Sequence, residues 1–182
     1  GIRRLSIGIQ SFNDVLLKKM NRRHNAIQAV EAIKNAVAAG FCDISADLIY
    51  GLPGLTKSGW KTNLETVFSL PVTHLSAYHL TYHEGTPFYT WLKKGTLKPA
   101  TEPTSIAHFE TLVKMAAGNG FEHYEISNFA KNGLFSKHNS SYWTGKKYLG
   151  LGPSAHSFNG FSRQWNVAHT EKYIHSLQQN QL

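Results

Sequence analysis

The chain has 182 residues, of which 41% are hydrophobic and 12% aromatic, and it carries a formal net charge of +8 at pH 7. This composition is typical of one globular domain, or of one domain with an appendage, and no apolar run approaches the roughly 18 residues of a membrane span. The single cysteine, Cys42, excludes an internal disulfide and a metal site made of cysteines alone. We therefore expect a reducing cytoplasm, and the positive charge favours an anionic partner without naming it.

The first 82 residues alternate short apolar runs with helical patterns. Strands are expected at residues 5–10, 44–49 and 74–80, and helices at residues 11–20, after the cap Asn25 as far as Gly40, and from Thr56 to Pro71. The second helix would turn Ile27, Val30, Ile33 and Val37 inward, and the third Trp60, Leu64, Val67 and Phe68. Strand–helix alternation predicts an α/β fold with a parallel sheet. Three strands exclude a closed eight-stranded barrel, which leaves an open sheet or the second half of a partial barrel.

After residue 82 the elements become shorter and less regular. Helices are expected at residues 86–94, 104–117 and 167–177, and strands at 121–127, 148–151 and 155–158, whereas residues 131–147 have a loop-like composition. The helix at 104–117 would turn Ile106, Phe109, Leu112, Val113 and Ala116 inward. We therefore divide the chain into residues 1–82 and a small α+β region at residues 83–182.

One acidic residue interrupts the central apolar strand. In DISADLIYGLPG, residues 43–54, Asp47 stands between buried positions, and Gly51 and Pro53 break the chain soon afterwards. A carboxylate is costly to desolvate without a hydrogen-bond partner, so an acid near the C-terminal end of a strand is a candidate ligand contact. The alternative is a structural Asp47 that caps its own loop.

Basic residues concentrate at residues 18–24, KKMNRRH. Such a stretch is more often the solvated end of a helix than a binding site. Nucleic acid remains an alternative partner, but no alternation of glycine, aromatic and basic residues typical of a single-strand platform is present.

Six motifs, taken in order, resemble a known family. They are Gln10, Arg22, ADLIYGLPG at 46–54, YEISNFA at 124–130, HNSSYW at 138–143 and GLGPSAHSF at 150–158. The chain resembles the oxygen-independent coproporphyrinogen III oxidase family of radical S-adenosylmethionine (SAM) proteins, and the HNxxYW and YEISNFA signatures resemble its heme chaperone branch. The resemblance implies strands four to six of a partial (β/α)6 barrel followed by a C-terminal region. It also implies a longer protein, because the CxxxCxxC loop that holds a [4Fe–4S] cluster does not occur in this chain.

The same resemblance assigns SAM contacts. It implies Gln10, Arg22 and Asp47, and less firmly Thr81 and His156, because the last two positions are apolar in the oxidase branch. A guanidinium suits the carboxylate of SAM, while Asp47 and Gln10 suit its hydroxyl or ammonium groups. No ligand of the cluster is expected among these residues.

His138 is the candidate heme contact. A lone histidine is more often structural than a ligand, but the HNxxYW motif is associated with heme in the chaperone branch. An imidazole followed by Tyr142 and Trp143 would offer an axial nitrogen beside aromatic surface.

Two function classes follow for the parent protein. One is a heme chaperone that holds SAM and a [4Fe–4S] cluster and passes heme to acceptor proteins; the other is a radical SAM oxidoreductase that decarboxylates coproporphyrinogen III in porphyrin biosynthesis. The intact HNSSYW favours the chaperone. This segment by itself is expected to be catalytically inactive, because the cluster ligands lie outside it.

Overall fold

The structure is a computed structural model that describes residues 1–180. Its internal contacts divide the chain after Phe135 into a first and a second unit, each described by itself below. Residues 83–135 belong to the first unit in this division. The boundary expected after residue 82 is a different division of the chain, and it stays a prediction.

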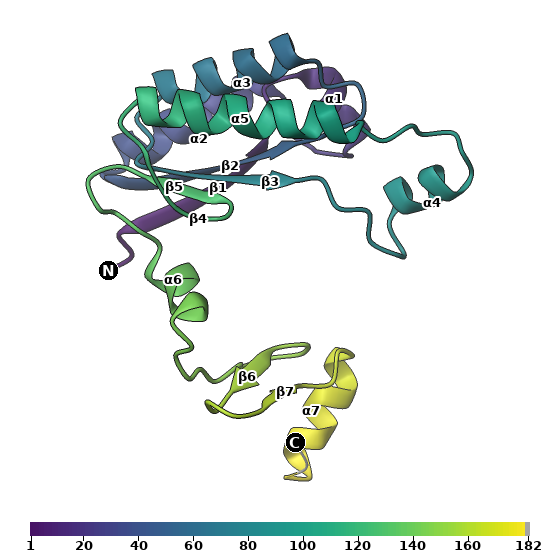
Figure 1. The fold of residues 1–182 in the computed structure, drawn as a ribbon. Coiled ribbons are helices and arrows are strands. Elements are labelled where there is room, and N and C mark those ends of the chain that lie inside the picture. Colours follow the sequence, from purple (N-terminus) through teal and green to yellow (C-terminus); the bar gives the residue numbers. More distant parts are fainter. Residues whose placement is uncertain (181–182) are drawn as a thin grey trace. The chain divides into compact units, whose positions relative to one another are not determined.

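Three parallel strands form the centre of the first unit (Figure 1). They are β1 (Arg4–Gln10), β2 (Asp43–Tyr50) and β3 (His74–His79), and they lie next to one another in chain order. Two short antiparallel strands, β4 (Glu122–Glu125) and β5 (Asn128–Ala130), extend the sheet beyond β3 in the order β3-β5-β4. The three predicted parallel strands are confirmed. The strand expected at residues 121–127 is confirmed as the shorter β4, whereas β5, into which the chain then reverses, was not expected.

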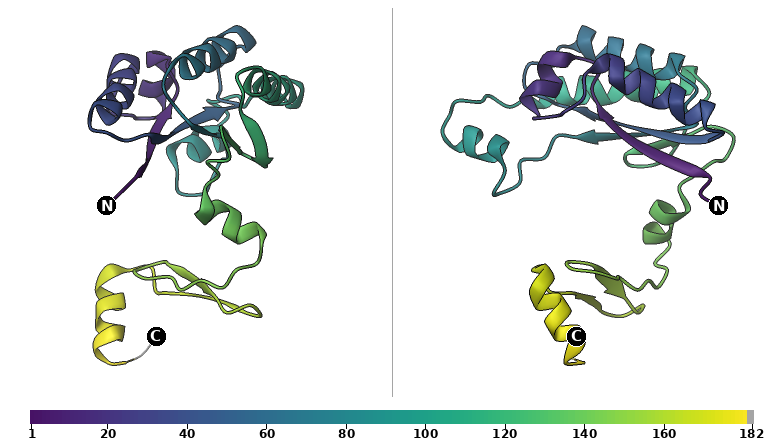
Figure 2. Two further views of the ribbon diagram at one scale, coloured as in Figure 1. Left: turned by 90° about the vertical axis from the view of Figure 1, so that its left-hand side faces the viewer. Right: turned by 180° about the vertical axis from the view of Figure 1, so that it is seen from behind.

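Four helices cover one face of this sheet (Figures 1 and 2). They are α1 (Asp14–Lys19), α2 (Ala26–Ala38), α3 (Lys57–Ser69) and α5 (Glu102–Gly118). The shorter α4 (Pro87–Lys93) lies on a long connection that extends away from the sheet (Figure 1). The predicted caps Asn25 and Thr56 accept hydrogen bonds from the first turns of α2 and α3, which fixes where these helices begin.

Small and large apolar side chains share the core between helices and sheet. The predicted inward residues Ile33, Leu64 and Leu112 are fully buried. The expectation was wrong for Ile27, which is 68% exposed, and for Ile106, which is 51% exposed; Val37 is exposed as well. Their places are taken by Ala29 and Ala36 on α2 and by His108 on α5. The two alanines are small, which lets α2 pack closely on the sheet.

The second unit contains short elements. They are α6 (Lys137–Trp143), β6 (His156–Phe158), β7 (Arg163–Trp165) and α7 (Thr170–Gln178), with β6 and β7 paired antiparallel. The loop expected at residues 131–147 is wrong where α6 forms. The strand expected at 148–151 is reduced to one bridge between Tyr148 and Phe158. Within the described residues, no helix is long and apolar enough to cross a membrane.

Candidate functional site

Polar side chains form rows across the sheet face that the helices leave uncovered. The parallel register places Ser6 beside Ser45 and His74, and places Gly8 beside Asp47 and Ser76 in the next row. Successive side chains of a strand point to opposite faces, so the alternate residues Ile7, Ala46 and Leu75 face the helices. Parallel sheets are normally covered by apolar contacts on both faces. A polar sheet face without helices over it therefore points to a ligand or a polar partner, with Ser45, His74 and Ser76 buried within its rows.

Asp47 lies in the middle of this face. Its carboxylate accepts hydrogen bonds of 3.1 and 3.2 Å from the Ser6 hydroxyl on the neighbouring strand, rather than capping its own loop. Burial raises the pKa of Asp47 above its usual value, while the hydroxyls of Ser6, Ser76 and Ser45 oppose that shift. The carboxylate is thus incompletely compensated within the chain, so a ligand that donates hydrogen bonds or carries positive charge would stabilise it.

Gln10 ends β1 in a strained conformation. The pairing with β2 shifts between Gly8 and Gln10, and Gln10 has a φ of 67°, in the left-handed region that a residue with a side chain rarely adopts. The buried Gln10 amide folds back over Gly8, where an added Cβ would lie 2.7 Å from its Nε2. Since Gly8 pairs with Asp47, the amide and the carboxylate occupy the same region of the sheet. Strain of this kind concentrates at ligand sites.

Arg22 lies in the connection between α1 and α2. His24 contacts the carbonyl oxygen of Ile9 through Nε2 at 3.0 Å, which ties this connection to the end of β1. The Arg22 side chain is exposed and lines a cavity of about 490 Å³ with Lys18, Lys19 and the aromatic residues Phe88 and Trp91 of α4. The basic residues of this cavity give it the charge that an anionic ligand group requires.

The remaining predicted SAM contacts are more dispersed. Thr81 is exposed and follows β3, and its hydroxyl donates to the carbonyl oxygen of His79 at 3.5 Å. His156 begins β6 in the second unit. The structure therefore brings Gln10 and Asp47 together on neighbouring strands of the first unit, with Arg22 tied to the end of one of them and Thr81 following the third strand. These five assignments stay predictions.

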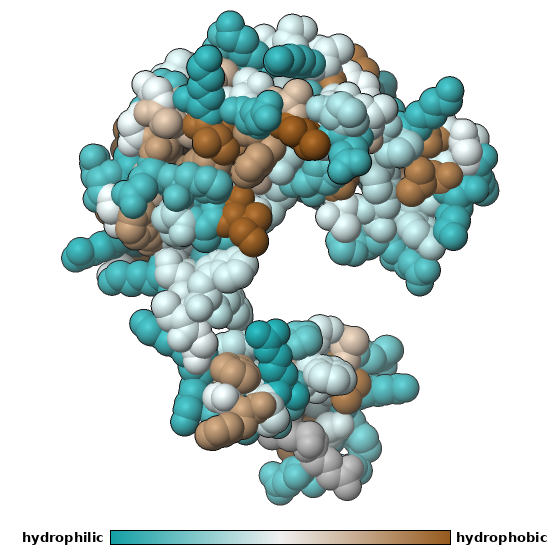
Figure 3. Space-filling model, in the orientation of Figure 1, coloured by the Kyte–Doolittle hydropathy of each residue, from teal (hydrophilic) through white to brown (hydrophobic). Residues whose placement is uncertain are grey.

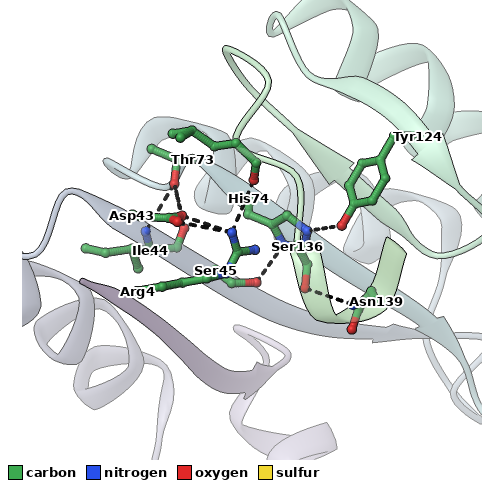
Figure 4. Close-up of polar contacts among 10 residues, drawn as sticks. Arg4, Asp43, Ile44, Ser45, Thr73, His74, Tyr124, Ser136 and Asn139 are labelled. Carbon is green, nitrogen blue, oxygen red and sulfur yellow. Dashed lines mark hydrogen bonds and ion pairs between the residues drawn. The ribbon is translucent and has the colours of Figure 1, made fainter. Parts of the chain in front are cut away.

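A charged network occupies the N-terminal end of the same sheet face (Figure 4). Arg4 forms an ion pair with Asp43 at 3.1 Å, and Asp43 also accepts from the Thr73 hydroxyl. The His74 ring shares 2.7 Å hydrogen bonds with the Ser45 hydroxyl through Nδ1 and with the Tyr124 hydroxyl through Nε2. Burial lowers the pKa of His74 to about 4. His74 is therefore a neutral, structural residue that joins β2, β3 and β4.

His138 lies in the second unit on α6, not on a loop. Its Nε2 meets the Tyr142 hydroxyl at 3.3 Å, and the two rings pack edge to face. His138, Tyr142 and Tyr148 line a cavity of about 430 Å³ that also includes Leu149, Leu151 and His156. The structure thus brings together two histidines that the sequence assigned to different ligands.

The residues present do not fit an iron–sulfur cluster. Such clusters are held by several thiolates, and this chain offers only the exposed Cys42. Among the described residues, no group of three or more His, Cys, Asp or Glu side chains is placed to hold a metal ion. No chemical step through a cluster is assigned to this chain.

Sequence reasoning missed the serine rows and the sharing of one cavity by two histidines. The serines had a signal: Ser6, Ser45 and Ser76 each alternate with an apolar residue, as expected of strands with one polar face. The strand containing Asp47 was read as buried because its apolar residues dominated the pattern. The shared cavity had no local signal, since it joins residues 18 positions apart through the folding of β6.

Comparisons with known proteins agree with this architecture. Residues 1–67 match the Radical SAM superfamily. The chain is 38% identical over 174 residues to the heme chaperone HemW of Bacillus subtilis, covering 96% of this chain and 46% of that protein. It is 36% identical over 157 residues to the mitochondrial radical S-adenosyl methionine domain-containing protein 1 of Danio rerio, covering 86% of this chain and 35% of that protein.

A solved structure shares the fold. Coproporphyrinogen III oxidase (HemN) from Escherichia coli superposes with a TM-score of 0.79 at 20% identity, covering 98% of this chain and 44% of that one. The chain thus spans less than half the length of the relatives it matches. From the sequence match and the relatives at 36 to 38% identity, the chain belongs to the HemN/HemW-like family of radical SAM proteins.

Proposed function

We propose that this chain is the part of a radical SAM heme chaperone that completes its SAM site and carries a heme contact. The observation that carries the proposal is the combination of the polar sheet face around Asp47 and Gln10 with an intact HNSSYW motif at His138. Relatives of 33 to 38% identity bear the name heme chaperone HemW. The cysteine ligands of a [4Fe–4S] cluster would lie in a part of the protein outside this chain.

Each residue of the SAM site would have a distinct role. Arg22 would bind the amino-acid carboxylate, because a guanidinium offers parallel N–H donors to two oxygens. Asp47 and Gln10 would accept from ammonium or hydroxyl groups, and a cationic ligand group would offset the desolvation of the Asp47 carboxylate. Thr81 and His156 would contribute lesser contacts. When bound, SAM supplies the radical chemistry of the family; these residues bind and orient it.

Removal of either charged residue is expected to weaken SAM binding. In the natural protein that carries this chain, Asp47→Ala and Arg22→Ala should each cost about 1 to 3 kcal/mol of binding free energy, the usual loss for a charge-assisted hydrogen bond. The fold should survive, since Arg22 is exposed and Asp47 accepts its hydrogen bonds from Ser6 on the sheet face without helices. Anaerobic calorimetry with SAM measures the change.

Matched variants separate binding from general effects of charge. Arg23→Ala removes the neighbouring cation, and Glu65→Ala removes an exposed carboxylate on α3. Neither should change SAM affinity. Unchanged affinity in both Asp47→Ala and Arg22→Ala would return these residues to a structural role.

Replacement of His138 is expected to reduce heme binding. Hemin titrated into the natural protein should give a Soret band that is lost or shifted in His138→Ala, with affinity lower by about tenfold or more, equivalent to about 1.4 kcal/mol. The melting temperature should change little, because the His138 ring contacts Tyr142 through an edge-to-face packing and a weak hydrogen bond.

His175→Ala is the control, since His175 is exposed on α7 of the same unit and does not line the cavity. It should bind hemin as the wild type does. If His138→Ala lowers the melting temperature while the Soret band and affinity stay the same, His138 is a structural residue.

The chaperone proposal extends to partners and compartment. Heme would pass to acceptor proteins, and the basic charge would assist binding of its anionic propionates. A reducing cytoplasm suits a thiolate-held cluster, and we place the protein there. Decarboxylation of coproporphyrinogen III is the alternative activity. It is tested by supplying that substrate to the reconstituted protein and measuring the carbon dioxide released.

A further inference from the structure

His138 and His156 line one cavity of the second unit, although 17 residues separate them in sequence. His138 belongs to α6 and His156 begins β6. Tyr142 and Tyr148 extend the aromatic lining, with ring centroids 5.1 Å apart and nearly perpendicular. The cavity volume, about 430 Å³, falls within the range of small-molecule and cofactor sites.

The loop of residues 149–155 forms the wall of this cavity beside His156, and three hydrogen bonds hold it in place. The backbone N–H of Gly150 donates to the Ser157 hydroxyl at 2.9 Å, and the N–H of Gly152 donates to the Tyr173 hydroxyl at 3.1 Å. The Asn166 amide donates to the carbonyl oxygen of Gly152 at 2.8 Å. A Cβ at Gly150 would lie 2.2 Å from the backbone oxygen of His156, so glycine is required for this close approach. The wall beside His156 is therefore formed before any ligand arrives.

Two features of this wall resemble a binding site rather than a structural turn. Ser154, which lines the cavity, has a φ of 61° in the left-handed region, and such strain is retained where surrounding contacts impose it. Leu149 and Leu151 are 75% and 81% exposed, and they offer apolar surface beside the imidazoles. Figure 3 shows hydrophobic residues at the surface of this unit among hydrophilic ones. A ligand with a broad apolar face would cover such side chains.

The side chains that line the cavity decide which kind of metal centre it can hold. A bare zinc ion requires three or four protein ligands, whereas this cavity contains two imidazoles, and its lining residues include no carboxylate or thiolate. Iron in a porphyrin already has four equatorial nitrogens and needs only axial ligands from the protein. Two imidazoles and apolar side chains in one cavity match that requirement.

We propose that His156 supplies a second axial imidazole to the iron porphyrin held at His138. This inference rests on the proposed heme contact at His138 and adds a residue to it. The 3.3 Å contact between His138 Nε2 and the Tyr142 hydroxyl is long for a hydrogen bond to a hydroxyl, so iron can replace it at small cost. The family resemblance implies a SAM contact at residue 156, and a contact made by its backbone would leave the imidazole available to iron.

Hemin binding to the natural protein tests the proposal. Wild-type protein with ferric heme should show a low-spin, six-coordinate spectrum by optical absorption and electron paramagnetic resonance. His138→Ala and His156→Ala should each become high-spin, and hemin affinity should fall about tenfold or more in each. Added imidazole should restore the low-spin spectrum in both variants, and their circular dichroism spectra should match the wild type, which checks that each has kept its fold. His169→Ala, a change at an exposed histidine of the same unit outside this cavity, should match the wild type.

The outcomes separate this inference from the proposed function. If His156→Ala keeps the wild-type spectrum and affinity while His138→Ala loses them, His156 is not an axial ligand and the heme contact at His138 survives. If neither substitution changes the spectrum or affinity, or the wild type binds no hemin, both proposals fail. A low-spin wild type that becomes high-spin in each of the two variants supports both. A high-spin wild type overturns the second ligand alone.

Discussion

Replacement of Trp60 by alanine is expected to destabilise the first unit by about 3 to 5 kcal/mol, the usual cost of removing a large aromatic side chain from a core. Trp60 is fully buried between α3 and its neighbours. Its Nε1 donates to the backbone oxygen of His108 at 2.8 Å, which joins α3 to α5, and its ring packs 5.8 Å from Tyr50 at the end of β2. The substitution removes apolar contacts and leaves the His108 carbonyl without this donor.

Urea unfolding of wild type and variant at one pH measures this loss. Trp91→Ala provides the matched control, because Trp91 is 37% exposed on α4 and makes fewer core contacts. It should cost about 1 kcal/mol, in the ordinary range of substitutions outside the core. Equal losses for Trp60→Ala and Trp91→Ala would show that the contact between α3 and α5 contributes little to the stability of the sheet.

The first unit was predictable from sequence because its signals are local. Asn25 followed three residues later by Gln28 forms a capping box, and Thr56 caps α3, so the beginnings of both helices are marked in the sequence. Short apolar runs bounded by Gly and Pro marked the parallel strands. The inward faces were less predictable. Ile27 is exposed and Ala29 buried, since hydrophobicity does not reveal how closely a helix approaches the sheet.

The second unit was less predictable because its elements are short and depend on distant partners. α6 spans seven residues of polar and aromatic character, and a Ser136 cap on a Gly- and Asn-rich stretch is a weak helix signal. β7 has three exposed residues and is defined by its pairing with β6. A hairpin of this size has no apolar alternation that a sequence pattern can detect.

The candidate site was predictable in its charged residues and unpredictable in their surroundings. Asp47 is conspicuous because a carboxylate in an apolar run is costly. The left-handed conformation of Gln10 has no sequence signal, because a residue with a side chain adopts it only under constraint from its neighbours. The serines around Asp47 become meaningful once the register places them in rows.

His74 links this site to the pH dependence of stability. It is buried in the row next to Asp47, and its ring forms hydrogen bonds with two hydroxyls, one on β2 and one on β4. Its pKa of about 4 when folded lies below the usual 6.5, chiefly because of burial. As the pH falls below 6.5, the unfolded chain takes up a proton that the folded chain does not, so folding stability decreases and the full loss is reached below pH 4.

This titration is expected to remove up to about 3 kcal/mol of stability, the free-energy equivalent of lowering the His74 pKa from 6.5 to about 4. The lowered pKa of His108 acts in the same direction. Asp47 opposes both, because its raised pKa lets the folded carboxyl accept a proton before the unfolded one does. The pH dependence of total stability therefore combines the titrations of these three groups. A variant is needed that isolates the contribution of His74.

His74→Gln is that variant, since an amide can donate and accept hydrogen bonds toward Ser45 and Tyr124 without titrating. Urea unfolding at pH 7, 6, 5 and 4 gives the difference in stability between wild type and variant at each pH. The wild type should lose about 2 to 3 kcal/mol relative to His74→Gln over this range, most of it between pH 6.5 and 4. His83→Gln, at an exposed loop histidine, should follow the wild type. A constant difference between wild type and His74→Gln would mean that His74 takes up its proton equally in the folded and unfolded chains.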